Sequence, residues 1–475
     1  MKKHRSRFLS GLLVVAMVAA LAIPAAAEMV QLNATTGVTI YVDDQKVDPR
    51  NSQGDQVDAL LTGGTTYLPI RALGDALGKD IGWDESTTTA YVSGYEADPK
   101  AAEYLEEYFD IAPLSGTVSR AAFDAALEAI GGSATEGTGG LTVADAVVAA
   151  VKAAGLDELA QTYTRDNNAK ANERIAAYGL PAMEGEVAAY VAAALDSDLA
   201  YATFDFDAAL DAETANTLLM NAVDISGQGR NYLGMASDSD IYAKLQSAFD
   251  AIYDFSTLND DTVQQLWSIG ETLVSERITT GFGLKSSDYD ARFLDEYTIQ
   301  YGHSNITHAK QLIALLNSEG IGAKVALEPK ISIFEFPEYS GDLSTSIEYD
   351  MKLEFDSLED RAAFMDLVNP YVTRGMEGNT HSQLDGAWLT PCFNSYAEID
   401  GYDEICDNVV ACGKYSLHPF SLPEQVEAVS ASISEAADAF NATLEEGDTP
   451  ITTEVVPLWC NPAFYVYLQD MAASA

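Results

Sequence analysis

The run SIEYDMKLEF, residues 346–355, constrains the fold of this chain more than any other stretch. Every second side chain is apolar, and the side chains between them are polar or charged: the apolar set is Ile347, Tyr349, Met351, Leu353 and Phe355. A period of two predicts a β-strand whose two faces meet different surroundings. Such a strand fits an antiparallel sheet with one wet side, whereas strands of a parallel sheet are apolar on both faces.

The sequence around this strand, residues 301–475, mixes helices and strands. SNITHAKQLIALLNSEG has helical spacing and a terminating Gly320, and AKVAL and ISIFEF follow as strands. Ser357 and Asp360 form a capping box at the start of another helix, and Ser421 to Phe440 form a further helix. We therefore expect an α+β domain, an antiparallel sheet with helices on one face.

The middle of the chain is Ala-rich and predicts helices, which we divide into a helical region, residues 96–160, and a helical domain, residues 161–300. Thr142 and Asp145 form a capping box ahead of an apolar stripe. GGSATEGTGG, residues 131–140, has the composition of a flexible linker. The prediction for the whole chain is thus a multidomain α+β protein.

The N-terminal segment, residues 28–95, predicts a small β-α-β unit. It contains VTIYVDDQKV and then TYLPIRALGDALGKDIGWDESTTTAYV, in which a short helix and a Trp-Asp turn lie between strands. This order of features resembles the copper amine oxidase N-terminal domain, also called the stalk domain. The resemblance implies an accessory module of exported bacterial proteins that carries neither copper nor oxidase chemistry. Trp83 is expected to cover the helix of this module or to contact a ligand.

A second, shorter resemblance follows the stalk domain. TVSRAAFDAALEAI is similar to the second helix of an S-layer homology repeat, a module that holds cell-wall polymers. The Gly-x-Asp-Gly-x-Phe loop typical of such repeats is replaced by APLSGT. The resemblance implies that Arg120 contacts the polymer, and an ordinary helical hairpin is the alternative.

Residues 1–27 have the layout of a secretory signal peptide: a basic start, an apolar run and an Ala-x-Ala cleavage signal before Glu28. Cleavage there leaves 26 − 4 = 22 basic residues against 73 acidic ones, a net charge of 22 − 73 = −51. Such a surface repels nucleic acid and anionic lipid. We expect an extracellular or cell-surface protein with no membrane span after cleavage, and an uncleaved anchor is the alternative.

The acidic composition raises the question of calcium. ATFDFDAALDAE gathers Asp205, Asp207, Asp211 and Glu213 but lacks the glycine that an EF-hand loop needs at its sixth position. We expect a solvated acidic loop and no cofactor, with a calcium-stabilised scaffold as the open alternative.

Four cysteines lie in the last quarter of the chain, and an even number in an exported protein favours disulfides. The expected pairs are Cys406 with Cys412 and Cys392 with Cys460. A zinc site of Cys406, Cys412 and His418 is the alternative, although its spacings are longer than those of usual zinc ligand pairs.

No motif of the sequence assembles catalytic groups. The mature chain has neither the His-x-His pair nor the Asn-Tyr-Asp/Glu setting of a copper amine oxidase, which excludes that activity. Residues 304–327 have the helix, Gly-Ile turn and strand of a transglutaminase-like fold. Such an enzyme needs a nucleophilic cysteine at the start of that helix, but every cysteine of this chain lies more than 70 residues later. His303 and His308 are five residues apart, so they do not share a helix face as metal ligands would. No Gly-rich phosphate loop occurs.

We therefore expect an exported, non-catalytic envelope protein that binds cell-wall polymer or an extracellular ligand. Aromatic and arginine side chains dominate binding energetics, so the expected contacts are Trp83, Arg120, Trp388 and Trp459. The alternative is an extracellular hydrolase of peptide or glycan, with its site in the C-terminal α+β domain near His303, His308 or His381.

Overall fold

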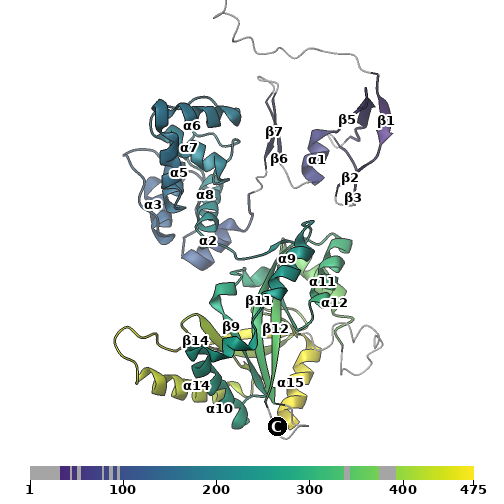
Figure 1. Cartoon of the computed structure of the whole chain (residues 1–475), viewed down its shortest axis with the longest axis vertical. Helices are drawn as coiled ribbons and strands as arrows, with labels where there is room; N and C mark the ends of the chain where they lie inside the picture. The colour runs from purple at the N-terminus through teal and green to yellow at the C-terminus, as the bar shows by residue number, and fades with distance from the viewer. Residues whose placement is uncertain are drawn as a thin grey trace, which may run out of the picture.

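The computed structural model describes residues 33–42, 45–50, 55–76, 80–84, 89–93, 97–335, 343–373 and 392–474. In chain order these residues form a small N-terminal module, a helical body and a C-terminal barrel (Figure 1).

Short antiparallel strands and one helix make up the N-terminal module. β1 (Thr35–Val38), β4 (Ala59–Thr62) and β5 (Thr65–Tyr67) form one sheet; β2 (Ile40–Val42) pairs with β3 (Gln45–Val47), and β6 (Asp80–Asp84) pairs with β7 (Thr89–Ser93). α1 (Ile70–Ala76) begins directly after Pro69, which has no N–H and therefore suits a helix start. The predicted helix and its flanking strands are present.

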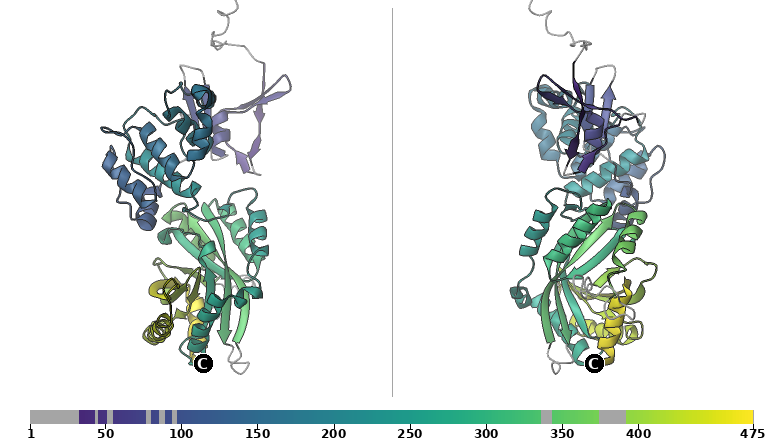
Figure 2. Two further views of the ribbon diagram at one scale, coloured as in Figure 1. Left: turned by 60° about the vertical axis from the view of Figure 1, so that its left-hand side comes forward. Right: turned by 90° about the vertical axis from the view of Figure 1, so that its right-hand side faces the viewer.

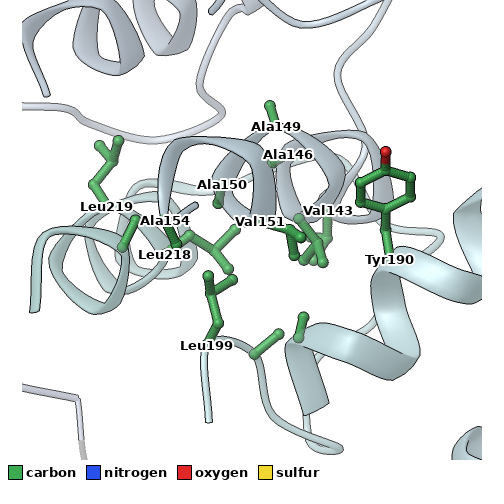
Figure 3. Close-up of a cluster of buried hydrophobic side chains, with 14 of the residues drawn as sticks. Val143, Ala146, Ala149, Ala150, Val151, Ala154, Tyr190, Leu199, Leu218 and Leu219 are labelled. Carbon is green, nitrogen blue, oxygen red and sulfur yellow. The ribbon is translucent and has the colours of Figure 1, made fainter. Parts of the chain in front are cut away.

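Residues 101–225 form one helical body. Its helices are α2 (Ala101–Phe109), α3 (Arg120–Ala129), α4 (Val143–Ala153), α5 (Asp157–Tyr163), α6 (Arg165–Ala177), α7 (Val187–Asp196) and α8 (Ala212–Ile225). α4 packs against α7 and α8, and Val151, Leu199 and Leu218 are fully buried in their common core (Figure 3). The many alanines let these helices approach closely. The predicted capping box of Thr142 and Asp145 starts α4.

The C-terminal part contains a closed antiparallel barrel of eight strands. Around the ring they are β11 (Ala323–Glu335), β12 (Leu343–Phe355), β10 (Thr298–His303), β13 (Cys392–Ser395), β17 (Thr452–Cys460), β14 (Asp403–Cys412), β15 (Tyr415–His418) and β9 (Gly281–Ser286), which pairs again with β11. Two short strands, β8 (Gly234–Met235) and β16 (Phe420–Ser421), pair with β11 and β14. Closure removes the exposed sheet edges.

Helices cover the outer face of the barrel (Figure 2). They are α9 (Ile241–Asp250), α10 (Asp261–Ser275), α11 (Ile306–Glu319), α12 (Leu358–Val368) and α14 (Val426–Asn441). The apolar face of the run 346–355 lies under them, with Tyr349, Met351 and Leu353 fully buried. On the opposite, inner face, α15 (Pro462–Ser474) packs on Ile405 and Leu458. The expected sheet with helices is therefore present, and its closure is the feature that the sequence did not predict.

The boundaries of the structural units differ from the expected ones. α5 to α8 share one core with α2 to α4, so no break falls at residue 160. α10 and β9, which precede residue 300, belong to the barrel. The expected domain of residues 161–300 is therefore divided between the helical body and the barrel.

A buried ion cluster joins the helical body to the barrel. Glu354 of β12 accepts from Arg230 at 3.1 Å, and its other carboxylate oxygen lies 3.1 Å from the ammonium of Lys100 and 3.3 Å from that of Lys324. Asp98 lies 2.8 Å from Arg230. Because Lys100 immediately precedes α2 and Glu354 lies on β12, the cluster fixes the position of one unit on the other.

Candidate functional site

The inner face of the barrel carries charged side chains from three neighbouring strands. Asp350 lies 2.6 Å from Lys285 and 2.7 Å from Lys330, and Lys352 lies 2.8 Å from Glu328. The strand register explains their meeting, since Asp350 stands opposite Glu328 and Lys330 opposite Glu348. The side chains predicted to face water are thus turned into the closed barrel.

The electrostatics of this group favour the charged forms. Burial alone would raise the pKa of Asp350, but the ammonium groups of Lys285 and Lys330 outweigh it and hold that pKa well below its usual range. Burial alone would lower the pKa of Lys285, but Asp350 and Glu328 outweigh it and raise that pKa. The interior therefore holds fixed charges of both signs.

Two glycines leave room for these side chains. A Cβ at Gly302 would lie 2.9 Å from Oδ1 of Asp350 and 3.1 Å from Nζ of Lys330. A Cβ at Gly283 would lie 3.3 Å from the Lys330 side chain. The ion pairs occupy the space that larger residues on β9 and β10 would fill.

A second polar group lies on β14 and β15 of the same inner face. The Ser416 hydroxyl and Nε2 of His418 are 2.8 Å apart, and Nδ1 of His418 is 2.8 Å from Oδ2 of Asp407. Tyr396 donates to the same Asp407 oxygen at 2.8 Å. Asp407 is fully buried and His418 nearly so, whereas Ser416 is half-buried.

The partners select one tautomer of the neutral His418 ring. A carboxylate only accepts, so Nδ1 carries the proton in its bond to Asp407, and in the neutral ring Nε2 then accepts from Ser416. Oδ1 of Asp407 is buried and has no hydrogen-bond partner among the described residues. The group is therefore a hydroxyl, an imidazole and a carboxylate connected in series.

Part of this arrangement follows from local sequence. Ser416 and His418 are two residues apart on a strand, so both point to one face. Asp407 reaches them because β14 and β15 form a hairpin in which Ala411 stands opposite Ser416. Sequence reasoning considered His418 only as a zinc ligand and missed this group, because neither the hairpin register nor the barrel closure was known.

Among the predicted contacts, Arg120 is engaged within the helical body. Its guanidinium donates to Thr135, to the carbonyls of Glu136 and Gly140, and to Asp145 at 3.0 Å. It thereby ties the segment 131–140 to α4. Trp459 packs on the apolar cluster outside the barrel.

The other predicted contacts fall where side chains are not described. The side chain of Trp83 and the whole of Trp388 lie outside the described residues, as does His381. The structure brings none of the predicted contacts together within the described residues.

His303 and His308 contact each other, with His303 Nε2 2.9 Å from His308 Nδ1. Nδ1 of His303 also accepts from the backbone of Asn305. Burial, assisted by His308, lowers the pKa of His303 to about 4. The described part of the chain places no carboxylate in hydrogen-bond contact with either ring.

Neither expected disulfide is present, since all four cysteines are free. Cys406 and Cys412 lie six residues apart on β14, a span of about 20 Å that no disulfide bridges. Cys392 is displaced by two residues from the partner of Cys460, which is Asn394, and diagonal neighbours lie about 7–8 Å apart. Burial raises the pKa of the Cys392 thiol to about 12, which makes it a poor nucleophile.

The acidic loop is exposed, as expected. Asp211 caps α8 by accepting from Thr214, and Asp205 accepts from the backbone of Asp207. Over the described ranges, no group of three or more His, Cys, Asp or Glu side chains could hold a metal ion. In those same ranges no helix is both long and apolar enough to cross a membrane.

Comparison with known proteins identifies the N-terminal module. Residues 29–98 match the copper amine oxidase N-terminal domain family. The stalk-domain resemblance is confirmed. The match ends ahead of α2, so it covers neither the helical body nor the barrel. No curated protein matches the chain, and no solved structure does.

Proposed function

We propose that this protein is exported to the cell envelope and binds a small charged ligand in its C-terminal barrel, such as a peptide fragment of cell-wall polymer. The observation that carries the proposal is the inner face of the barrel, where Lys285, Lys330 and Lys352 are paired with Asp350 and Glu328. Small closed barrels of eight strands either fill with side chains or hold one small ligand.

The energetics of buried charge support a functional interior. Removing two charges from water is costly, and replacing a buried ion pair by well-packed apolar residues is often neutral or stabilising by about 1–4 kcal/mol. The ion pairs are therefore weak evidence for a purely stabilising role, which leaves room for a role in binding. Fixed charges of both signs suit a ligand that itself carries carboxylate and ammonium groups, as wall peptides do.

The leader sequence and the N-terminal module support the location. Residues 1–27 read as a signal peptide, and the net charge of −51 after cleavage suits a soluble extracellular surface. The stalk domain occurs on exported bacterial proteins and would serve here as an accessory module. Nucleic acid and anionic membranes are poor partners for such a surface.

Calorimetric titration tests the proposal, using the chain from residue 28 and soluble cell-wall peptides released by enzymatic digestion. We expect binding in the wild type and at least a tenfold loss in the charge-neutral double variant Lys330→Met/Asp350→Asn, because a lost buried charged contact is worth about 2–5 kcal/mol. Lys170→Met, on the exposed face of α6, is the matched control. Absence of wild-type binding, or equal binding by the double variant, rejects the assignment.

Retention on purified, insoluble cell walls tests the polymer contacts separately. Each of Trp83, Arg120, Trp388 and Trp459 is changed to Ala, and pelleted protein is measured. Reduced retention in at least one variant supports contact with intact polymer. Unchanged retention in all four variants rejects these contacts with intact polymer and leaves only the ligand bound in the barrel.

A further inference from the structure

Three side chains inside the barrel form the hydrogen-bonded series that acyl transfer requires. We propose that Ser416 is an acyl-accepting nucleophile, with His418 as its general base and Asp407 as the group that orients the base, and that the barrel hydrolyses an ester or amide of the ligand it binds. The substrate class rests on the proposed function above. The reactivity of Ser416 does not, because a small acyl donor tests it directly.

The distances satisfy the geometric requirements of this chemistry. A nucleophile needs a base within about 2.6–3.2 Å, and the base needs a third group that fixes its orientation. Ser416 and His418 are 2.8 Å apart, and His418 and Asp407 are 2.8 Å apart. The hydrogen bond from Tyr396 holds the same carboxylate oxygen in place. Such a constellation is recognised by geometry and roles, and it recurs on unrelated folds.

The position of Ser416 gives it access to solvent. It stands one residue pair inside the turn of the β14–β15 hairpin, where Gly413 and Lys414 are exposed. His418 and Asp407 lie deeper in the barrel and are buried. The nucleophile thus faces the rim, and the base and its orienting group are shielded from water.

A lysine on the neighbouring strand stands opposite the nucleophile. Lys285 on β9 is directly opposite Ser416, and directly opposed residues have Cβ atoms about 4.5–5.5 Å apart. Its ammonium group lies 2.6 Å from Asp350, which keeps it charged. To stabilise the negative oxygen that develops when a carbonyl is attacked, this ammonium group would have to be shared between the substrate oxygen and Asp350.

The proposed reaction needs only the acyl compound and water. Oγ of Ser416 attacks the carbonyl carbon as its proton passes to Nε2 of His418, and the leaving alcohol or amine departs with that proton. Water then attacks the acyl-serine and gives a proton to His418, which passes it to Oγ as the carboxylic acid and free Ser416 are released. Asp407 remains a carboxylate and stabilises the imidazolium formed in each half.

Acylation of the intact mature chain tests the inference. The protein is incubated with an alkyl fluorophosphonate and, separately, with p-nitrophenyl acetate; adducts are located by peptide mass spectrometry and nitrophenolate release is followed by absorbance. We expect one adduct per chain, on Ser416, and none in Ser416→Ala. Ser344→Ala, an exposed serine on β12, should react as the wild type does.

The variant Asp407→Asn tests whether Asp407 has a chemical role, because asparagine keeps the shape of the side chain and removes its charge. The amide can hold the wrong imidazole tautomer, and the analogous change in a serine protease lowers kcat about 10⁴-fold. We expect acylation by the variant to slow by several orders of magnitude. Circular dichroism confirms that each variant is folded.

The outcomes distinguish the two proposals. Adducts on another residue, no adduct, or a rate unchanged in Asp407→Asn overturns the catalytic inference even where wall peptides bind. Specific acylation of Ser416 without peptide binding supports the catalytic centre and rejects only the proposed ligand.

Discussion

Replacing Glu354 by glutamine should reveal how strongly the helical body is fixed to the barrel. Glu354 is fully buried, and Lys100, Arg230 and Lys324 all lie within 3.3 Å of its carboxylate. Glutamine keeps the shape but removes the charge. Among the described residues, Asp98 then remains within ion-pair distance of Arg230 and Lys324, and no carboxylate remains within that distance of Lys100.

The expected magnitude follows from the burial. Removing one partner of a buried ion pair costs about 3–5 kcal/mol because uncompensated charge remains. A domain of about 150–250 residues changes its Tm by about 2–4 °C for each kcal/mol, so Glu354→Gln should melt about 6–20 °C lower. The double variant Glu354→Gln/Lys100→Met should regain part of that loss, because it removes one of the unpaired cations.

The stability difference between wild type and Glu354→Gln should depend on pH, and the pKa of Glu354 gives the direction. Burial alone would raise the pKa of Glu354, but Arg230, Lys100 and Lys324 outweigh it and lower that pKa. The stability that the carboxylate contributes is therefore complete above its unfolded pKa of about 4.3, and it is lost as the pH falls through the lower folded value. The Tm difference between wild type and variant should shrink below about pH 4.

Thermal melting by circular dichroism at pH 7 and pH 3.5 measures the difference. Glu446→Gln, in an exposed loop, is the control and should stay within about 0.5 kcal/mol of the wild type. A loss below about 1 kcal/mol in Glu354→Gln, or a loss equal at both pH values, would refute the account of the cluster.

Three further outcomes are expected. Gly302→Ala should lower stability by about 1–3 kcal/mol in a urea melt, because its Cβ would lie 2.9 Å from Asp350. His303→Gln should lose less stability than wild type between pH 6.5 and pH 4, because a histidine whose folded pKa is about 4 destabilises the fold as the pH falls through that window. Arg120→Met should make residues 131–140 several-fold more sensitive to limited proteolysis, since their ties to α4 are lost.

Local patterns predicted the parts of the fold that local physics decides. The capping box at Thr142 and the N-cap at Ser357 start helices because a side-chain oxygen there satisfies a free backbone N–H, and this depends on neighbours in sequence only. The strand of residues 346–355 follows from its period of two. The order of short elements was also sufficient to recognise the stalk domain.

The site depended on contacts between distant segments, which no pattern in this sequence reports. The alternation in residues 346–355 requires that its two faces differ, but it does not say whether the polar face meets water or a closed interior. That choice is made when β11, already paired with β12, also pairs with β9. Asp350 and Lys285 are 65 positions apart and become neighbours only through that closure.

Closure of the barrel also shields the polar residues of β14 and β15 from water. On an open sheet Ser416, His418 and Asp407 would be wetted, and water would compete for each hydrogen bond at little cost. Inside the barrel, His418 and Asp407 are shielded, so their hydrogen bond is stronger and the imidazole is held in one tautomer. Ser416 remains half-buried at the rim, where a substrate can reach it. A search for catalytic groups in such a chain should therefore begin with the polar face of its most regular strands.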